Sequence, residues 1–287
     1  MKNLGLVLVL LLSSASGLFA QVAAEVLMDK TQFLPGEAIT VSTRVVNHSG
    51  QTLHFGKENW LSYSVEGNDG FIPVKTGDPD VAHEFDLESA QAAKQPSDLA
   101  PYFTLSKPGT YTVIATVRLE GWGAEVTSPP KRFTIIRGTK VWEQGFGVPQ
   151  AGTMTPEMRK YILIQATYLK SMKLYLRLTD STESRTIRLV PIGPMVSFSR
   201  LQTQLDKQNN LHLLYEDGPR TSNYSVISPD GEITVRQTHM YTDGGPRLKM
   251  DASGDIAVVG GARHLAANDL PAIKPPVLSD DIPPPKP

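Results

Sequence analysis

Apolar and polar residues alternate along most of this chain with a period of two, which places successive side chains on opposite faces of a β-strand. In the range 39–45, one face would carry Ile39, Val41, Thr43 and Val45, and the intervening residues are polar. In the range 111–119, one face would carry Tyr111, Val113, Ala115, Val117 and Leu119. The pattern predicts an all-β protein.

Glycine and proline interrupt the first part of the chain, 25–137, where these strands would begin and end. Pro35-Gly36 and Pro108-Gly109 each precede a strand, and the polar run 47–50 is typical of a turn. Roughly seven strands fit into about 110 residues, which is the pattern of an immunoglobulin-like β-sandwich. We therefore expect 25–137 to fold as such a sandwich.

Three motifs in this part occur in a fixed order: PGE at 35–37, a strand ending in N-x-S-G at 47–50, and L-x-x-PG-x-Y-x-V at 105–113. Their order resembles bacterial immunoglobulin-like modules, including macroglobulin-type modules and the module of small bacterial proteinase inhibitors. The complete chain also resembles exported, uncharacterised bacterial proteins with this module at the N-terminus. Because the motifs mark turns and strands, the resemblance implies a fold and no activity.

The stretch 138–158 is rich in glycine and proline, and we interpret it as a linker between two domains. Thr155-Pro156-Glu157 could cap a short helix, with proline at its first position. However, YILIQATY at 161–168 is rich in β-formers and is soon followed by LYLRLTD at 174–180. A β-hairpin is therefore the preferred interpretation of this region.

From 159 to 266 the chain repeats a unit of strands and turns. LYLRLTDSTESRTIRLVPIG aligns with LHLLYEDGPRTSNYSVISPDG, and IAVVGGARH begins a third copy, so that Leu174, Leu211 and Ile256 start corresponding strands. Periods of about 40 to 50 residues are typical of propeller blades, but a closed propeller needs about four blades. We expect an open, blade-like β-meander of incomplete propeller-type repeats, packed on the first domain or on another chain in a homo-oligomer.

The two ends of the chain are predicted to lie outside these domains. Residues 1–24 combine Lys2 with an apolar run too short to cross a bilayer, followed by small residues, as in a secretory signal peptide cleaved after Ala20 or Ala24. No second apolar run is long enough to span a membrane. The tail, 267–287, contains seven prolines and is predicted to be disordered.

Composition narrows the compartment and the partners. The 287 residues include no cysteine, which excludes disulfides and thiolate metal sites and favours a bacterial exported protein, periplasmic or extracellular. The formal net charge is -1, so nothing indicates a nucleic-acid partner. With 40% hydrophobic residues, the chain can build a substantial core.

An acid-rich motif, DASGD at 251–255, raises the question of a calcium loop, because oxygen-bearing side chains occupy alternate positions. A β-like run follows at once, and the twelfth position of such a loop would be Ala262 instead of an acidic residue. The related segment DKQNN at 206–210 has a single acidic residue. We therefore interpret both segments as tight turns between strands.

No other residue set predicts a reaction, a metal site or a cofactor. The histidines show no ligand spacing; they are His48, His54, His83, His212, His239 and His264. Ser128 and Lys131 cannot share a helical turn, because Pro129-Pro130 separates them. There is no G-x-S-x-G nucleophile elbow. We therefore predict a protein that is not an enzyme, with no catalytic residue.

Trp122 is the one side chain that we single out as a candidate partner contact. The sequence LEGWGAE places it between two glycines, at the tip of a predicted hairpin. An exposed tryptophan there could bind a sugar or a protein, and the alternative is that it folds back over the end of the sandwich.

These features lead to one function hypothesis and two alternatives. The first is an exported, non-catalytic binding or structural module with an unknown protein or glycan partner, bound through loop tips such as 121–123 or through an edge strand. The second, an inhibitor of an exported protease, follows from the resemblance alone. The third, a glycan-binding accessory protein, follows from the blade-like repeats.

Overall fold

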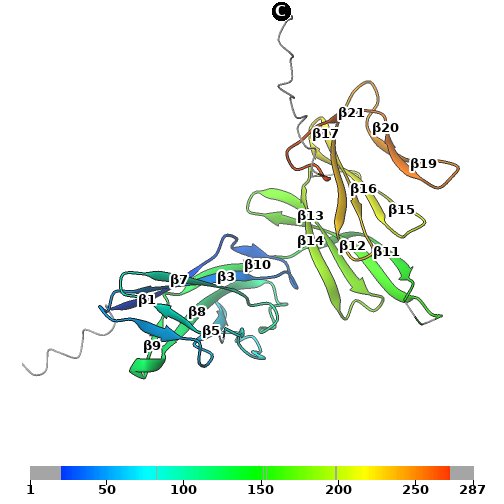
Figure 1. The fold of residues 1–287 in the computed structure, drawn as a ribbon. Coiled ribbons are helices and arrows are strands. Elements are labelled where there is room, and N and C mark those ends of the chain that lie inside the picture. Colours follow the sequence, from blue (N-terminus) through cyan, green and yellow to red (C-terminus); the bar gives the residue numbers. More distant parts are fainter. Residues whose placement is uncertain (1–20, 82, 151, 153, 198, 272–287) are drawn as a thin grey trace, which may run out of the picture. The chain divides into compact units, whose positions relative to one another are not determined.

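The computed structural model describes residues 21–271 except 82, 151, 153 and 198, and almost all of its regular structure is β-strand, as the alternation predicts. The chain forms two compact units, divided between Arg137 and Gly138 (Figure 1). This division lies where the sequence predicted the first domain to end. Each unit has hydrophobic clusters of its own.

The first unit is a sandwich of two main sheets. Its elements are β1 (Val22–Leu27), β2 (Gln32–Phe33), β3 (Thr40–Asn47), β4 (Leu53–Phe55), β5 (Leu61–Gly67), β6 (Phe85–Leu87), β7 (Ala92–Asp98), β8 (Gly109–Leu119), the 3₁₀ turn η2 (Glu120–Trp122), β9 (Ala124–Thr127) and β10 (Lys131–Ile135). One sheet has the order β1-β3-β7 and the other β2-β10-β8-β5, with β9 beside β8 and a separate β4-β6 pair. The predicted β-sandwich is confirmed.

The core of this unit lies between the two sheets and follows the alternation directly. All the residues of the two predicted apolar faces, 39–45 and 111–119, are buried. The core also contains Trp60 and Phe133, whose large side chains fill space between the sheets. The strands of the sandwich are apolar on their inner side only. The outer side of β8 therefore carries threonines and Arg118.

The open edge of β5 is protected by side chains instead of another strand. Asp78 Oδ1 accepts a hydrogen bond from the Tyr63 amide at 2.9 Å, and Lys75 Nζ donates to the Tyr63 carbonyl at 2.8 Å. Lys75 and Asp78 also form an ion pair at 2.8 Å. An uncovered edge strand invites pairing with another chain, and charged side chains at the edge oppose it.

The sandwich begins earlier than the predicted residue 25. Val22 and Ala24 are buried core residues of β1, and Val22 pairs with Asn47 on β3. The sequence signal was ambiguous because small apolar residues here suit both a cleavage site and a buried strand. Residues 1–20 of the predicted signal peptide lie outside the described part of the chain.

The second unit contains two large antiparallel sheets and a separate hairpin. Its strands are β11 (Thr139–Val148), β12 (Glu157–Tyr168), β13 (Ser171–Asp180), β14 (Thr186–Pro194), β15 (Gln202–Leu205), β16 (Leu211–Gly218), β17 (Thr221–Ile227), β18 (Ile233–Met240), β19 (Arg247–Met250), β20 (Ile256–Val259) and β21 (Ala262–His264). The orders are β11-β12-β13-β14, β15-β16-β17-β18-β21 and β19-β20. The predicted open meander of blade-like sheets is confirmed.

The prediction that 138–158 is a linker is wrong. β11 lies within this range and pairs with β12 along its length, from Thr139 opposite Gln165 to Val148 opposite Glu157. Among the residues of β11, only Phe146 is buried. Because both faces of this strand lie mostly in solvent, it lacks the apolar alternation by which strands are recognised.

β16 belongs to the sheet that forms the central layer of the second unit. On one side Leu211, Leu213 and Tyr215 pack with residues of the β11–β14 sheet. On the other side Leu214 packs with Leu248 and other residues of β17, β19 and β20. The β19-β20 hairpin therefore covers one face of the β15–β18 sheet, whereas the first sheet covers the other (Figure 1).

Two further details of the sequence interpretation need correction. Leu174 lies on β13, the third strand of its sheet, whereas Leu211 and Ile256 lie on second strands, β16 and β20. Alternation has the same period on every strand, so it could not show which strand of its sheet each of these segments forms. The predicted disordered tail also starts too early, because Asp269 is buried and the backbone of Leu270 bonds to that of Arg236. Residues 272–287 lie outside the described part.

Candidate functional site

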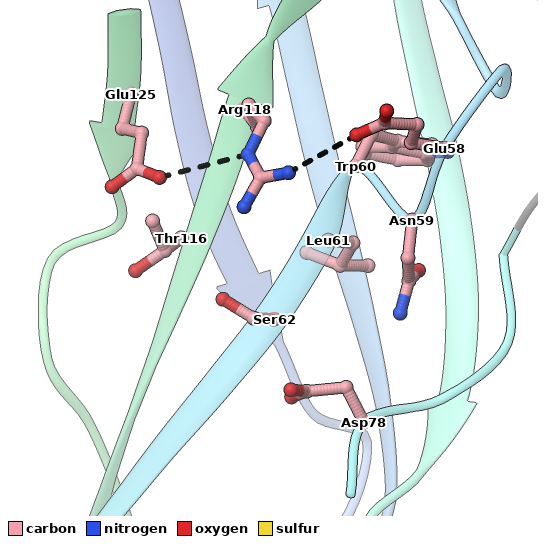
Figure 2. A pocket seen from close by; sticks show the side chains of 9 residues that line it. All are labelled: Glu58, Asn59, Trp60, Leu61, Ser62, Asp78, Thr116, Arg118 and Glu125. Carbon is pink, nitrogen blue, oxygen red and sulfur yellow. Dashed lines mark hydrogen bonds and ion pairs between the residues drawn. The ribbon is translucent and has the colours of Figure 1, made fainter.

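A polar cleft with a volume of about 300 Å³ lies on the outer side of β5 and β8 in the first unit (Figure 2). Alternation aims Ser62, Thr116 and Arg118 outward, away from the core. Asp78 comes from the segment beside the β5 edge, and Glu125 comes from β9. The complete lining is Glu58, Asn59, Trp60, Leu61, Ser62, Asp78, Thr116, Arg118 and Glu125.

Arg118 is the only cation of this lining, and it lies between two carboxylates. Its Nη1 is 3.5 Å from Glu58 Oε2, and its Nε is 3.8 Å from Glu125 Oε1 (Figure 2). All three side chains are about half exposed or more, so these ion pairs contribute little to stability. The guanidinium is thus held over the cleft by weak contacts, which an incoming acceptor could replace.

The floor of the cleft is rigid. The Trp60 side chain is buried, and its indole Nε1 donates to the Val81 carbonyl at 3.1 Å. Its ring packs against Phe55 and Phe85, at centroid distances of 5.0 and 5.6 Å. Asp78 is fixed by its bond to the Tyr63 amide. A rigid floor with exposed polar groups around it favours binding, because little conformational entropy is lost there.

The chemistry of the lining suits a polar ligand. Hydroxyl groups, the Asn59 amide and three carboxylates accept hydrogen bonds, and Arg118 can donate two parallel bonds to a carboxylate. The acidic groups do not converge: among the residues that the structure describes, no three histidine, aspartate or glutamate side chains are grouped as metal ligands would be. Within the same residues, no helix has the length and apolarity needed to cross a bilayer.

Trp122 does not line this cleft. It lies in η2, is partly buried and packs against the core of the first unit. The Trp122 side chain is therefore folded over the end of the sandwich. Together with Leu53, Phe55 and Leu119 it lines a smaller hollow of about 100 Å³. A wider hollow beside it, of about 520 Å³, includes His54 and Asp86, whose Nδ1 and Oδ1 atoms lie 2.6 Å apart.

The acid-rich motif is a turn, as predicted. Asp251 Oδ1 accepts hydrogen bonds from the Ser253 hydroxyl at 2.6 Å and the Asp255 amide at 2.9 Å, between β19 and β20. Gly254 has a φ of 87°, which a residue with a side chain rarely adopts.

Ser128, which the sequence analysis excluded as a nucleophile, is buried between β9 and β10. Its hydroxyl accepts a hydrogen bond from the Ala115 amide.

The turn at 206–210 contacts a buried pair of side chains that the sequence did not indicate. Asp206 accepts bonds from the Asn210 amide and side chain, both at 2.8 Å, and its Oδ2 is 3.3 Å from His212 Nε2. His212 Nδ1 is 2.7 Å from the Tyr224 hydroxyl, and both residues are buried. His212 lies on the strand face opposite Leu211 and Leu213, and the β19-β20 hairpin buries that face as well.

Comparisons with known proteins add little to this geometry. No model of a protein family matches the sequence, and no curated protein matches it either. Among solved structures, the chain is similar to the crystal structure of Spo0M, a sporulation control protein from Bacillus subtilis, at 10% identity and a TM-score of 0.31. This match covers 68% of the present chain and 79% of Spo0M. A likeness of this size carries no conclusion about function.

Proposed function

We propose that the chain is an exported, non-catalytic binding module, and that the cleft beside β5 and β8 is where its first unit contacts a partner. The observation that carries the proposal is the position of Arg118, exposed over a rigid floor and ringed by hydrogen-bonding groups. Such a cleft favours a polar partner segment that offers hydroxyl or amide groups, because three carboxylates already line it beside one arginine.

Export is supported by the sequence. Residues 1–20 have the charge and apolar run of a leader, and the absence of cysteine suits a protein that folds without disulfides. The burial of Val22 and Ala24 in β1 favours cleavage after Ala20 over cleavage after Ala24, because the first keeps the strand intact.

The test compares two charge reversals on the same sheet. Arg118→Glu would place a third carboxylate between Glu58 and Glu125, whereas Arg132→Glu changes an exposed arginine of β10, outside the cleft. In capture from an envelope extract, followed by mass spectrometry, we expect Arg118→Glu to lose a partner that the parent chain and Arg132→Glu both retain. Equal capture by all three proteins would contradict the role of the cleft.

A second candidate is glycan binding, favoured by the hydroxyl, amide and carboxylate lining. Sugar sites also use an aromatic platform, and the Trp60 ring is buried, while Trp122 lies in a different hollow. This second candidate is tested by pelleting the protein with insoluble polysaccharide. Pelleting that depends on Arg118 would assign a glycan to the cleft, and pelleting that depends on Trp122 instead would assign it to the end of the sandwich.

A further inference from the structure

Residues 262–270 form a strap along the side of β18 that faces away from β17. β21, the first part of the strap, pairs with β18 over three residues. The chain then leaves the sheet and returns at Leu270, whose amide and carbonyl groups both bond to the backbone of Arg236 at 3.0 Å. No apolar side chain between 262 and 270 is buried, so hydrophobic packing contributes little to holding the strap in place.

An ion pair joins the two ends of the strap. Arg263 Nη2 lies 2.6 Å from Asp269 Oδ2, and Arg263 Nη1 donates to the Thr238 carbonyl on β18 at 2.9 Å. Asp269 Oδ2 also accepts a bond from the Ala266 amide at 3.1 Å. The Asp269 side chain is only 2% exposed. Because a buried carboxylate depends on its partners, the closed strap depends on the contacts of Arg263.

His239 on β18 lies directly opposite Arg263 in the pairing of β18 with β21. It is buried, and its ring packs edge-on against the Tyr224 ring, at a centroid distance of 6.4 Å. Within the described part of the chain, the buried Nε2 atom of His239 has no hydrogen-bond partner. A neutral imidazole tolerates these surroundings far better than a charged one, because a buried charge needs a partner or water.

The groups that face His239 come from three elements. Tyr224 on β17 is uncharged near neutral pH, because burial raises its pKa to about 12, and its hydroxyl lies 2.7 Å from His212 Nδ1 on β16. Arg263 is contributed by β21, and Asp269 by the segment after β21. The charges next to His239 are therefore one cation and one carboxylate that are already paired with each other.

These surroundings act against a proton on His239. Burial, and then the charge of Arg263, lower the pKa of His239, and together they outweigh Asp269, which acts to raise it. Asp269 itself stays ionised, since hydrogen bonds from Ala266 and Arg263 outweigh the effect of its burial and hold its pKa below the usual value. Acid therefore acts on His239 before it neutralises Asp269.

We propose that protonation of His239 releases the strap 262–270 from β18. While the strap is closed, protonated His239 is a second cation beside Arg263, and Asp269 is already bonded to Arg263. Moving the strap into water separates the two cations and hydrates both. Release leaves the edge of β18 unpaired from 236 to 240, where an extended segment could pair with it. The inference goes beyond the proposed function, because it concerns the second unit and not the Arg118 cleft.

The direction of the pH dependence follows from the lowered pKa of His239. In the released state the imidazole is in water, where its pKa is the ordinary histidine value of 6.5. The closed strap is therefore fully favoured above pH 6.5, and it loses this advantage as the pH falls from 6.5 towards the lower value of the closed state. Over that range the ratio of closed to released chains should fall roughly tenfold for each pH unit.

The experiment is peptide-resolved amide hydrogen exchange on the full chain from about pH 7.5 to about pH 5, corrected for the pH dependence of intrinsic exchange. We expect peptides from 262–270 and from β18 to lose protection, by up to roughly tenfold for each pH unit below 6.5, while β12 and β13 keep theirs. His239→Gln, which takes up no proton, should keep the strap protected throughout. His264→Gln changes an exposed histidine of the same strap and should behave like the parent chain.

A second measurement needs no variant. In the parent chain, the His239 ring followed by NMR should titrate below the ordinary value of 6.5, over the same pH range in which the strap loses protection. A titration at or above that value would overturn the proposal, as would a strap equally protected at both ends of the pH range. Equal loss in His239→Gln would assign the release to another group. None of these outcomes involves Arg118, so the proposed function is tested separately.

Discussion

The hydroxyl of Tyr63 on β5 lies 2.8 Å from the hydroxyl of Thr43 on β3, so a hydrogen bond joins the two sheets of the first unit through their core. The Tyr63 hydroxyl also lies 3.3 Å from the Ser97 hydroxyl on β7. All three residues are buried. A polar group in a core fixes the relative position of its partners, because any displacement leaves a hydroxyl without a bond.

Tyr63→Phe should destabilise the first unit by about 1–3 kcal/mol, because the Thr43 and Ser97 hydroxyls would both stay buried without this partner. Urea unfolding measures the change. The double variant Tyr63→Phe/Thr43→Val should lose less than the sum of the two single variants, since it removes both ends of one bond. Additive losses would mean that the two hydroxyls are not coupled.

The buried tyrosines should make the protein less stable at alkaline pH. Burial raises the pKa of Tyr63, Tyr161 and Tyr215, and it raises the pKa of Tyr224 to about 12. The folded state thus keeps protons that the unfolded chain releases, so the stabilisation is complete below pH 10 and decreases as the pH rises towards the folded values. The urea midpoint and the tyrosinate absorbance, followed from about pH 8 upward, should change together.

The sequence was informative wherever a strand buries one face. The predicted core faces at 39–45 and 111–119 are correct residue by residue. It failed at β11, whose side chains are mostly in solvent. At β16 it placed the start of the strand at Leu211, but it could not show that both faces of that strand are buried. Alternation reports a difference between two faces of a strand, so it disappears when both faces have the same surroundings.

Of the candidate site, the sequence supplied less. The Arg118 cleft is assembled from β5, β8, β9 and the segment that carries Asp78, and no spacing along the chain indicates that these parts come together. The same holds for Tyr63 and Ser97, which are separated by 34 residues. Turns are different, because their bonds form within a few residues. That is why the turn at 251–255 could be predicted.

Asp206→Ala should destabilise the second unit more than Asp251→Ala does, although both remove the first residue of a hairpin turn. Asp206 bonds to Asn210 and contacts the buried His212, whereas the bonds of Asp251 are exposed. We expect about 1–3 kcal/mol for Asp206 and less for Asp251, measured by urea unfolding. Equal losses would show that the contact with His212 contributes nothing.

The same carboxylate contributes to the loss of stability in acid. Burial acts to raise the pKa of Asp206, but hydrogen bonds from Asn210 and His212 outweigh it and hold the pKa below its usual value. A lowered pKa means that the stabilisation is present above the unfolded value of 3.8 and is lost as the pH falls further. The difference in stability between the parent chain and Asp206→Ala should therefore shrink below that pH.

Cleavage of the proposed signal peptide is expected to leave Gln21 as the first residue, and intact-mass measurement of the processed protein tests this. A chain beginning at Glu25 would lose the pairs that Val22 and Ala24 make with Asn47 and Val45 on β3, together with the buried Val22 side chain. Loss of that side chain alone should cost roughly 1.5–3 kcal/mol in unfolding free energy. A mature protein that starts at Glu25 with unchanged stability would contradict the role of β1.

Phe146 decides whether the range 138–158 belongs to the second unit. Its ring lies in the core, stacked on Tyr161 at a centroid distance of 4.2 Å. Phe146→Ala should therefore cost about 3–5 kcal/mol, with faster amide hydrogen exchange across β12 and β13, its neighbours in the sheet. Val141→Ala, on the exposed part of the same strand, should stay within about 0.5 kcal/mol of the parent chain. In a flexible linker both changes would be equally harmless, so the contrast between the two variants, located by peptide-resolved exchange, separates a structural strand from a connection.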